Sequence, residues 1–147
     1  MFHLIPRTWL NAVALAFLLP LAACAESGAY VELKGQRYAI EVAADNASRE
    51  HGLMDRTHMD ANHGMLFVFD DDAPRAFWMK NTKIPLDMLF FDADMKLVSI
   101  QHSVPPCVAD PCAAYSSGAP ARYVLELNGG EAQKLGLTSG DTIEIHR

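Results

Sequence analysis

The feature that most constrains the fold is a long apolar stretch between residues 64 and 92 that is interrupted once by polar residues. Its first part, Met65 to Phe69, is a continuous apolar run, the pattern of a strand that is covered on both faces. A second run, Leu86 to Phe91, is apolar except for Asp87. We therefore expect both runs to lie in the core, with the rest of the chain arranged around them.

Short alternating segments on either side of this stretch predict a mainly β protein of one domain, as the length of 147 residues also suggests. Strands are predicted at residues 30–33, 37–42, 65–69, 76–79, 85–92, 97–104, 121–127 and 142–146, and short helices at 47–54 and 131–135. The charged residues 70–74 are expected to form a turn, and the proline-rich residues 105–120 a long loop. Seven or eight short strands with one or two short helices predict a compact antiparallel β-sandwich or barrel-like domain.

The N-terminus has the pattern of a targeting segment. Arg7 precedes an apolar run of 13 residues, Trp9 to Leu21, whereas about 20 are needed to span a bilayer. The run ends in Leu21-Ala22-Ala23-Cys24, which resembles the lipobox of bacterial lipoprotein precursors. Cys24 is therefore the predicted lipidated residue.

These features divide the chain into a lipoprotein-type signal peptide (1–23), a short tether (24–29) and a single β domain (30–147). The predicted location is the periplasmic face of the outer membrane, with the membrane as a partner through the lipid anchor. Cleavage by ordinary signal peptidase after Ala25 is the alternative, and it would leave a soluble periplasmic protein.

Charge and cysteine content narrow the partners and the compartment further. The formal net charge is −6 and the basic residues are scattered singly, so nucleic acid is not an expected partner. Cys107 and Cys112 lie five positions apart, and in an oxidising compartment such a pair is expected to form a disulfide that shapes one loop.

The polar residues within the apolar stretch are the main candidate site. Asp87 shares a predicted strand face with Leu89 and Phe91, so its carboxylate must be paired, hydrogen-bonded or protonated. The available partners are the cations Lys80 and Arg56 and the hydrogen-bond donors Asn81 and Thr82.

Two interpretations of this group are open. In the first, it is a structural cluster that holds the connection 80–84 in place. In the second, it is a ligand pocket in which Lys80 attracts an anionic group, Asn81 orients that group and Trp78 supplies an apolar wall. Trp78 considered alone is expected to lie in the core.

Two further functions are less favoured by the sequence. The segment 50–66 mixes imidazoles and thioethers of a kind that suits copper, but without regular ligand spacing. The copper candidates are His51, Met54, His58, Met59 and His63. No serine lies in a nucleophile-elbow pattern, so a hydrolase would depend on a carboxyl pair such as Asp87 and Glu126. No catalytic residue and no cofactor are therefore predicted.

The chain also resembles a known family. The residues that carry the resemblance are Glu50, Gly52-Leu53-Met54, Arg56, Gly64 to Phe69, Phe77 to Thr82, Ile84 to Phe90, Pro120-Ala121, Tyr123 to Leu127 and Gly140-Asp141. They are similar to a bacterial and archaeal domain-of-unknown-function family, numbered 192. The resemblance implies a compact, mostly β domain with one or two short helices that is often exported, and it does not supply a function. In this family glycine often occupies the hairpin turn where this chain has Met95.

Together these observations predict an envelope lipoprotein that is a non-catalytic binding module for a small or peptidic ligand or a protein partner. The alternative is a structural or interaction domain without a small-molecule site.

Overall fold

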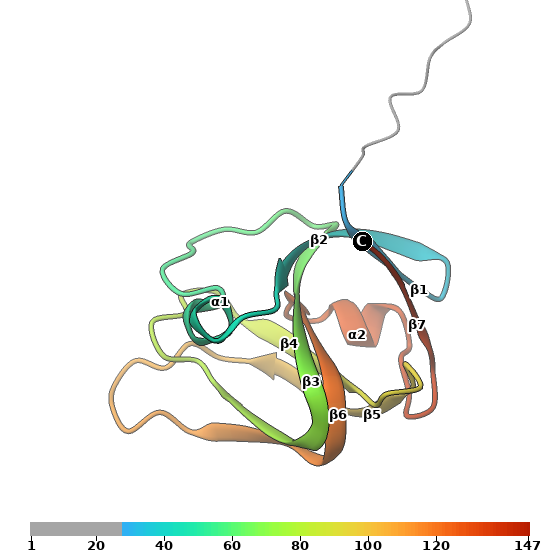
Figure 1. Cartoon of the computed structure of the whole chain (residues 1–147). Helices are drawn as coiled ribbons and strands as arrows, with labels where there is room; N and C mark the ends of the chain where they lie inside the picture. Colours follow the sequence, from blue (N-terminus) through green and yellow to red (C-terminus); the bar gives the residue numbers. More distant parts are fainter. Residues whose placement is uncertain (1–27) are drawn as a thin grey trace, which may run out of the picture.

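The computed structural model describes residues 28–147, so the predicted signal peptide and Cys24 lie outside the described residues. Seven strands form one curled sheet, in the order β5-β4-β6-β3-β2-β1-β7 (Figure 1). The strands are β1 (Tyr30–Leu33), β2 (Gln36–Ala43), β3 (His63–Trp78), β4 (Leu86–Phe91), β5 (Leu97–Val104), β6 (Ala114–Asn128) and β7 (Ile143–His146), and the helices are α1 (Asn46–His51) and α2 (Glu131–Lys134). The predicted mainly β, barrel-like fold is confirmed.

The two edge strands of the sheet meet at one end. The amide of Leu97 donates to the carbonyl of Asp141 at 2.7 Å, and the amide of Ile143 donates to the carbonyl of Met95 at 3.1 Å. These bonds connect the start of β5 to the start of β7, so the sheet curls into a half-barrel and part of each edge is protected.

Both faces of the central strands are covered, as the continuous apolar runs predict. One cluster includes Leu66, Leu89 and Leu125, and packs against α2 through Ala132. The other cluster, on the opposite face, includes residues 65, 67, 88, 90 and 124. Figure 1 shows α1 and α2 on opposite sides of β3 and β6. Within residues 28–147, no helix is both long and apolar enough to cross a membrane.

The first helix begins where its capping residues predict. The side chain of Asp45 accepts from the amide of Ser48 at 2.9 Å, and the Ser48 hydroxyl accepts in return from the amide of Asp45. Hydrogen bonds from Ser48 hold the pKa of the Asp45 carboxyl below its usual value. Gly52 ends the helix with a φ of 49°, which favours glycine.

Two features of the strand connections differ from the prediction: the direction in which one pair of strands runs, and the length of one loop. β2 and β3 pair in parallel, because the chain crosses over through α1 between them. The predicted loop at 105–120 is shorter than expected, because β6 already begins at Ala114 and pairs with the end of β3 at Trp78. The Cys107–Cys112 disulfide is present, with an S–S distance of 2.09 Å, and it closes the remaining loop.

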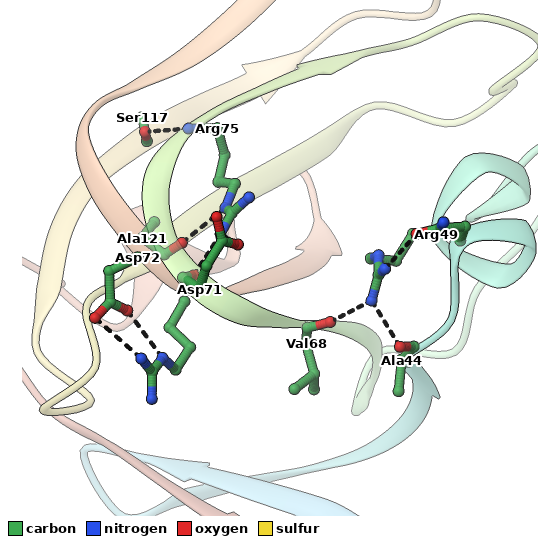
Figure 2. Close-up of polar contacts among 10 residues, drawn as sticks. Ala44, Arg49, Val68, Asp71, Asp72, Arg75, Ser117 and Ala121 are labelled. Atoms are coloured by element: carbon green, nitrogen blue, oxygen red, sulfur yellow. Dashed lines mark hydrogen bonds and ion pairs between the residues drawn. The ribbon is translucent and has the colours of Figure 1, made fainter.

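The predicted turn at 70–74 was wrong: β3 runs through it with irregular pairing. Arginines pair with two of the acidic residues there, Asp71 and Asp72 (Figure 2). Arg75 bonds to Asp71 and to the carbonyl of Ala121, while Arg122 bonds to both carboxylate oxygens of Asp72 at 2.8 and 3.0 Å. The hydrogen bond from Arg75 also holds the pKa of Asp71 below its usual value. These partners allow a charged segment to continue as a strand.

The turn between β4 and β5 uses a side-chain acceptor in place of a glycine. Met95 has a φ of 62°, a conformation that costs residues with a Cβ about 1 kcal/mol. Asp92 supports it by accepting from the amides of Asp94 and Lys96, both at 2.9 Å.

Replacing Met95 with glycine is therefore expected to raise the free energy of unfolding by about 0.5 kcal/mol, since relieved strain outweighs the extra entropy of the unfolded chain. Urea denaturation measures the change. Met95→Ala keeps the strain and is the control. A glycine variant no more stable than the alanine variant would contradict the prediction.

Candidate functional site

A carboxyl group lies at the floor of a small pocket on the sheet face next to α1. Glu126 of β6 pairs with Met65 of β3 on one side and with Met88 of β4 on the other. The register places these three side chains on one face, and both methionines are buried in the cluster there. Glu126 itself is only 4% exposed. The curled sheet therefore surrounds this carboxyl with apolar and thioether groups.

The pocket above Glu126 has a cavity volume of about 30 Å³. Its lining comes from α1 and the segment after it, from the aromatic residues of β3 and from the turn that follows β3. The lining includes Met54, Phe67, Phe77, Trp78, Lys80 and Thr82. Phe77 meets Phe67 edge-on, with ring centroids 5.0 Å apart, which fixes this apolar wall.

Burial changes the acidity of the Glu126 carboxyl. Desolvation raises its pKa to about 8, and no hydrogen bond or neighbouring charge within residues 28–147 acts against this shift. In the same part of the chain, every fully enclosed side-chain polar atom has a hydrogen-bond partner. The unpartnered oxygens of Glu126 are therefore reached through the pocket. A carboxyl with these properties is a typical feature of functional sites.

Trp78 and Lys80 lie together at the mouth of the pocket. Trp78 is 48% exposed, so the expectation that it lies in the core was wrong. It is the last residue of β3, where it pairs with Ala114 of β6. The ammonium nitrogen of Lys80 lies 5.4 Å from the centre of the Trp78 ring and 3.8 Å from a carboxylate oxygen of Asp110. The mouth thus combines an exposed aromatic surface with a positive charge.

The other residues of the connection 80–84 have different positions. Thr82 is buried and lines the pocket. Asn81 is exposed with a φ of 55°, and its carbonyl accepts from the amide of Asp55 at 2.8 Å. The disulfide loop is attached here, because the amide of Cys107 donates to the carbonyl of Met79 at 3.3 Å. A shallow hollow of about 140 Å³ separates Lys80 and Asn81 from that loop.

Asp87 is fully buried, but away from this pocket. Its carboxylate accepts from the amides of Ser103 at 2.7 Å, Gly130 at 3.1 Å and Ala132 at 2.7 Å. Two of these donors lie at the start of α2, where amides lack partners within the helix. The structure therefore gives Asp87 backbone partners in place of the expected Lys80 or Arg56, as a cap for α2.

The carboxyl pair on which a hydrolase would depend, Asp87 and Glu126, is also separated. Asp87 pairs in register with Leu127 and Glu126 pairs with Met88, so the two acidic side chains point to opposite faces of the sheet. They cannot act on one substrate as acid and base.

Arg56 and the copper candidates are not gathered at one site. Arg56 forms an ion pair with Glu41 at 2.5 Å. His51 and Met54 line the Glu126 pocket, whereas His58, Met59 and His63 line a separate hollow. Within residues 28–147, no group of three or more His, Cys, Asp or Glu side chains is arranged to hold a metal.

Sequence reasoning named Glu126 only as half of that carboxyl pair, and did not select it as a ligand-binding residue. The signal that could have identified it is its position in β6. Glu126 lies between the apolar residues Leu125 and Leu127, and its side chain shares a sheet face with that of Val124. What the local pattern lacked was the identity of its neighbours, because Met65 and Met88 come from strands far away in the chain.

A larger hollow, of about 920 Å³, lies beside the N-terminal end of the described chain and includes Gly28, Tyr30 and Arg37. The Arg37 guanidinium already stacks on the Tyr30 ring at 3.5 Å, and Tyr30 stacks on His146. Since these groups are engaged with one another, the Glu126 pocket is the stronger candidate despite its size.

Comparison with known proteins identifies relatives of the whole domain. The model of the family DUF192, described as "Uncharacterized ACR", matches residues 29–145. A crystal structure from Sinorhizobium meliloti 1021, described as a "putative transcription regulator", is 38% identical, covers 80% of this chain and 91% of its own, and has a TM-score of 0.72. A protein of unknown function from Novosphingobium aromaticivorans DSM 12444 is 33% identical, covers 79% of this chain and 82% of its own, and has a TM-score of 0.71. A search of curated proteins finds no match.

Proposed function

This chain belongs to the DUF192 family, whose description is "Uncharacterized ACR" and gives no function. From the site itself we propose that the protein is a non-catalytic binding module for a small or peptidic ligand, or for a protein partner. The observation that supports this is the unpartnered Glu126 carboxyl at the floor of an open pocket. A concave, mostly apolar site with a few converging polar groups is what small-ligand recognition requires.

The mouth of the pocket contributes the second part of the proposal. Lys80 is 40% exposed, and its partner Asp110 is 72% exposed, so their ion pair is easily exchanged for a ligand's anionic group. Trp78 offers an aromatic surface beside that charge. A ligand with one group in the pocket would thus also contact Lys80 and Trp78 at the mouth of the pocket.

The alternative is a structural or interaction domain, and Asp87 supports it in part because its contacts are entirely internal. The two functions differ in what Lys80 does. A structural lysine would contribute to stability, whereas a binding lysine would contribute to affinity.

Lys80→Met is expected to change the free energy of unfolding by less than about 0.5 kcal/mol, because an exposed ion pair contributes little. It is expected to weaken the binding of small carboxylates at least fivefold. The measurement is titration of the full-length protein with a panel of carboxylic acids, amines and amides, followed by Trp78 emission, with Trp78→Phe as background.

Lys83→Met is the matched control, since Lys83 is similarly exposed and pairs with Asp55 at 3.3 Å, but does not line the pocket. If no compound in the panel gives a saturable signal, and Lys80→Met lowers stability by more than Lys83→Met does, the structural alternative replaces the proposal.

The location of the module is the third part of the proposal. Cys24 lies four positions before Gly28, a separation that a fully extended chain spans in about 14 Å. Lipidation at Cys24 would therefore hold the domain close to the outer membrane on its periplasmic side. The Cys107–Cys112 disulfide fits the same oxidising compartment.

Cys24→Ser is expected to move the protein from the membrane fraction to the soluble periplasmic fraction. Fractionation of cells followed by immunoblotting measures this, and Cys107→Ser is the control cysteine variant. A wild-type protein that is already soluble would favour the alternative cleavage after Ala25.

A further inference from the structure

The Glu126 carboxyl has no hydrogen-bond donor within the described chain, and its oxygens are reached only through the pocket. It is 4% exposed and has no partner within residues 28–147. A donor that enters the pocket therefore gives these oxygens a direct hydrogen bond in surroundings that are otherwise apolar. A ligand group suited to the Glu126 carboxyl must donate a hydrogen bond to it. A positively charged donor would add an ion pair to that hydrogen bond.

Size and walls restrict which donor fits. A cavity of about 30 Å³ accepts a nitrogen and an adjacent methylene, but not the planar fork of a guanidinium. Phe67, Phe77 and Met54 supply apolar surface for that methylene. A metal ion would need several ligands, and no such group of ligands is present within residues 28–147.

On these grounds we propose that the Glu126 pocket binds a primary aliphatic ammonium group, carried either by a small amine or by a lysine side chain. This inference rests on the proposed binding function and names the ligand class of the same site. In the ion pair the carboxylate of Glu126 accepts from the ammonium nitrogen. When the free pocket holds a protonated Glu126, binding releases one proton to solvent.

Proton release makes the affinity depend on pH in a defined direction. The pKa of Glu126 is about 8, so each pH unit below it leaves roughly tenfold less carboxylate. Affinity for an amine should therefore rise at least tenfold between pH 6 and pH 8, while the amine itself stays protonated. The other charged or titratable groups that line the pocket are Arg49, Glu50, His51 and Lys80.

The test uses n-butylamine, butanoate and n-butanol, which share a chain length but differ in the end group. Each is titrated into the full-length protein at pH 6 and pH 8, with binding followed by nuclear magnetic resonance shifts. We expect butylamine to bind more tightly than the other two, and Glu126→Gln to lose at least tenfold in affinity together with the pH dependence.

Two variants outside the pocket serve as controls. Glu144→Gln removes an exposed carboxylate on β7, and His102→Gln removes an exposed histidine on β5; neither residue lines the Glu126 pocket. Both are expected to keep the affinity and pH dependence of the wild type. If either variant reproduces the loss seen in Glu126→Gln, the assignment to Glu126 is overturned.

Two peptide probes identify the source of the amine. These are acetyl-Gly-Lys-Gly-amide and the same peptide with an acetylated lysine. Binding of the first alone supports a lysine side chain, and binding of butylamine without the peptide supports a free amine. If butanoate or butanol binds at least as tightly as butylamine, the ammonium proposal fails while the binding module stands. If none of the probes or panel compounds binds, the proposed function fails as well.

Discussion

Asp87→Ala is expected to lower the free energy of unfolding by about 4 kcal/mol. The carboxylate is fully buried and accepts from three backbone amides, at 2.7, 3.1 and 2.7 Å. Hydrogen bonds to a charged group contribute about 1.5–3 kcal/mol each, and their loss also leaves buried amides unpaired. Chemical denaturation at pH 7 measures the difference, and circular dichroism shows whether the variant folds at all.

Asp87→Asn refines this test, because it keeps one acceptor oxygen and places an NH₂ group opposite an amide donor. One oxygen of Asp87 accepts from Ser103 and Gly130, while the other accepts from Ala132. The asparagine variant should therefore fall between wild type and alanine. Asp87→Ala costing less than about 1 kcal/mol, the range of an exposed polar residue, would contradict the capping role.

The second large effect is a gain in stability. Glu126→Gln is expected to raise the free energy of unfolding at pH 8.5 by roughly 3–5 kcal/mol, because glutamine has no charge to desolvate. At pH 5 the two proteins should be nearly equal in stability, since wild-type Glu126 is then protonated in the folded state. The measurement is urea denaturation of both proteins at pH 5, 7 and 8.5.

The sign follows from the direction of the shift. Burial raises the folded-state pKa of Glu126 from 4.5 to about 8, so between these values the folded protein binds more protons than the unfolded chain. Wild-type stability must therefore fall as pH rises through this window, by about 1.4 kcal/mol per pH unit. Glu126→Gln removes this slope.

Glu50→Gln is the control, because Glu50 is an exposed carboxylate near the same pocket. It should leave the wild-type pH profile unchanged. A Glu126→Gln profile parallel to the wild-type profile at all three pH values would show that Glu126 is ionised in the folded protein at neutral pH. The raised pKa would then be wrong.

Several parts of the fold were predictable because they depend on neighbours in sequence. The runs Met65 to Phe69 and Leu86 to Phe91 predicted strands that are covered on both faces, and the two core clusters confirm this. The family was also predictable, as its motifs are contiguous. The strand through residues 70–74 was not, since the partner Arg122 lies 50 positions from Asp72.

The candidate site was only partly predictable. Trp78 and Lys80 were correctly predicted to be neighbours, because residues two positions apart in the chain cannot lie far from each other. Asp87 was expected to share their site, and it lies elsewhere because α2 offers it amide donors 43 and 45 positions away. Glu126 was not selected, since it takes its surroundings from β3 and β4.

The amino-acid sequence by itself thus determined the central strands, the burial of their apolar side chains and the pairing of Cys107 with Cys112. These properties follow from alternation and from short separations along the chain. Only the tertiary structure decided which buried carboxyl is satisfied and which is free. Asp87 and Glu126 look alike as acidic residues within apolar strands, but they lie on opposite faces of one sheet. The register between distant strands places backbone amides around Asp87 and an open pocket above Glu126.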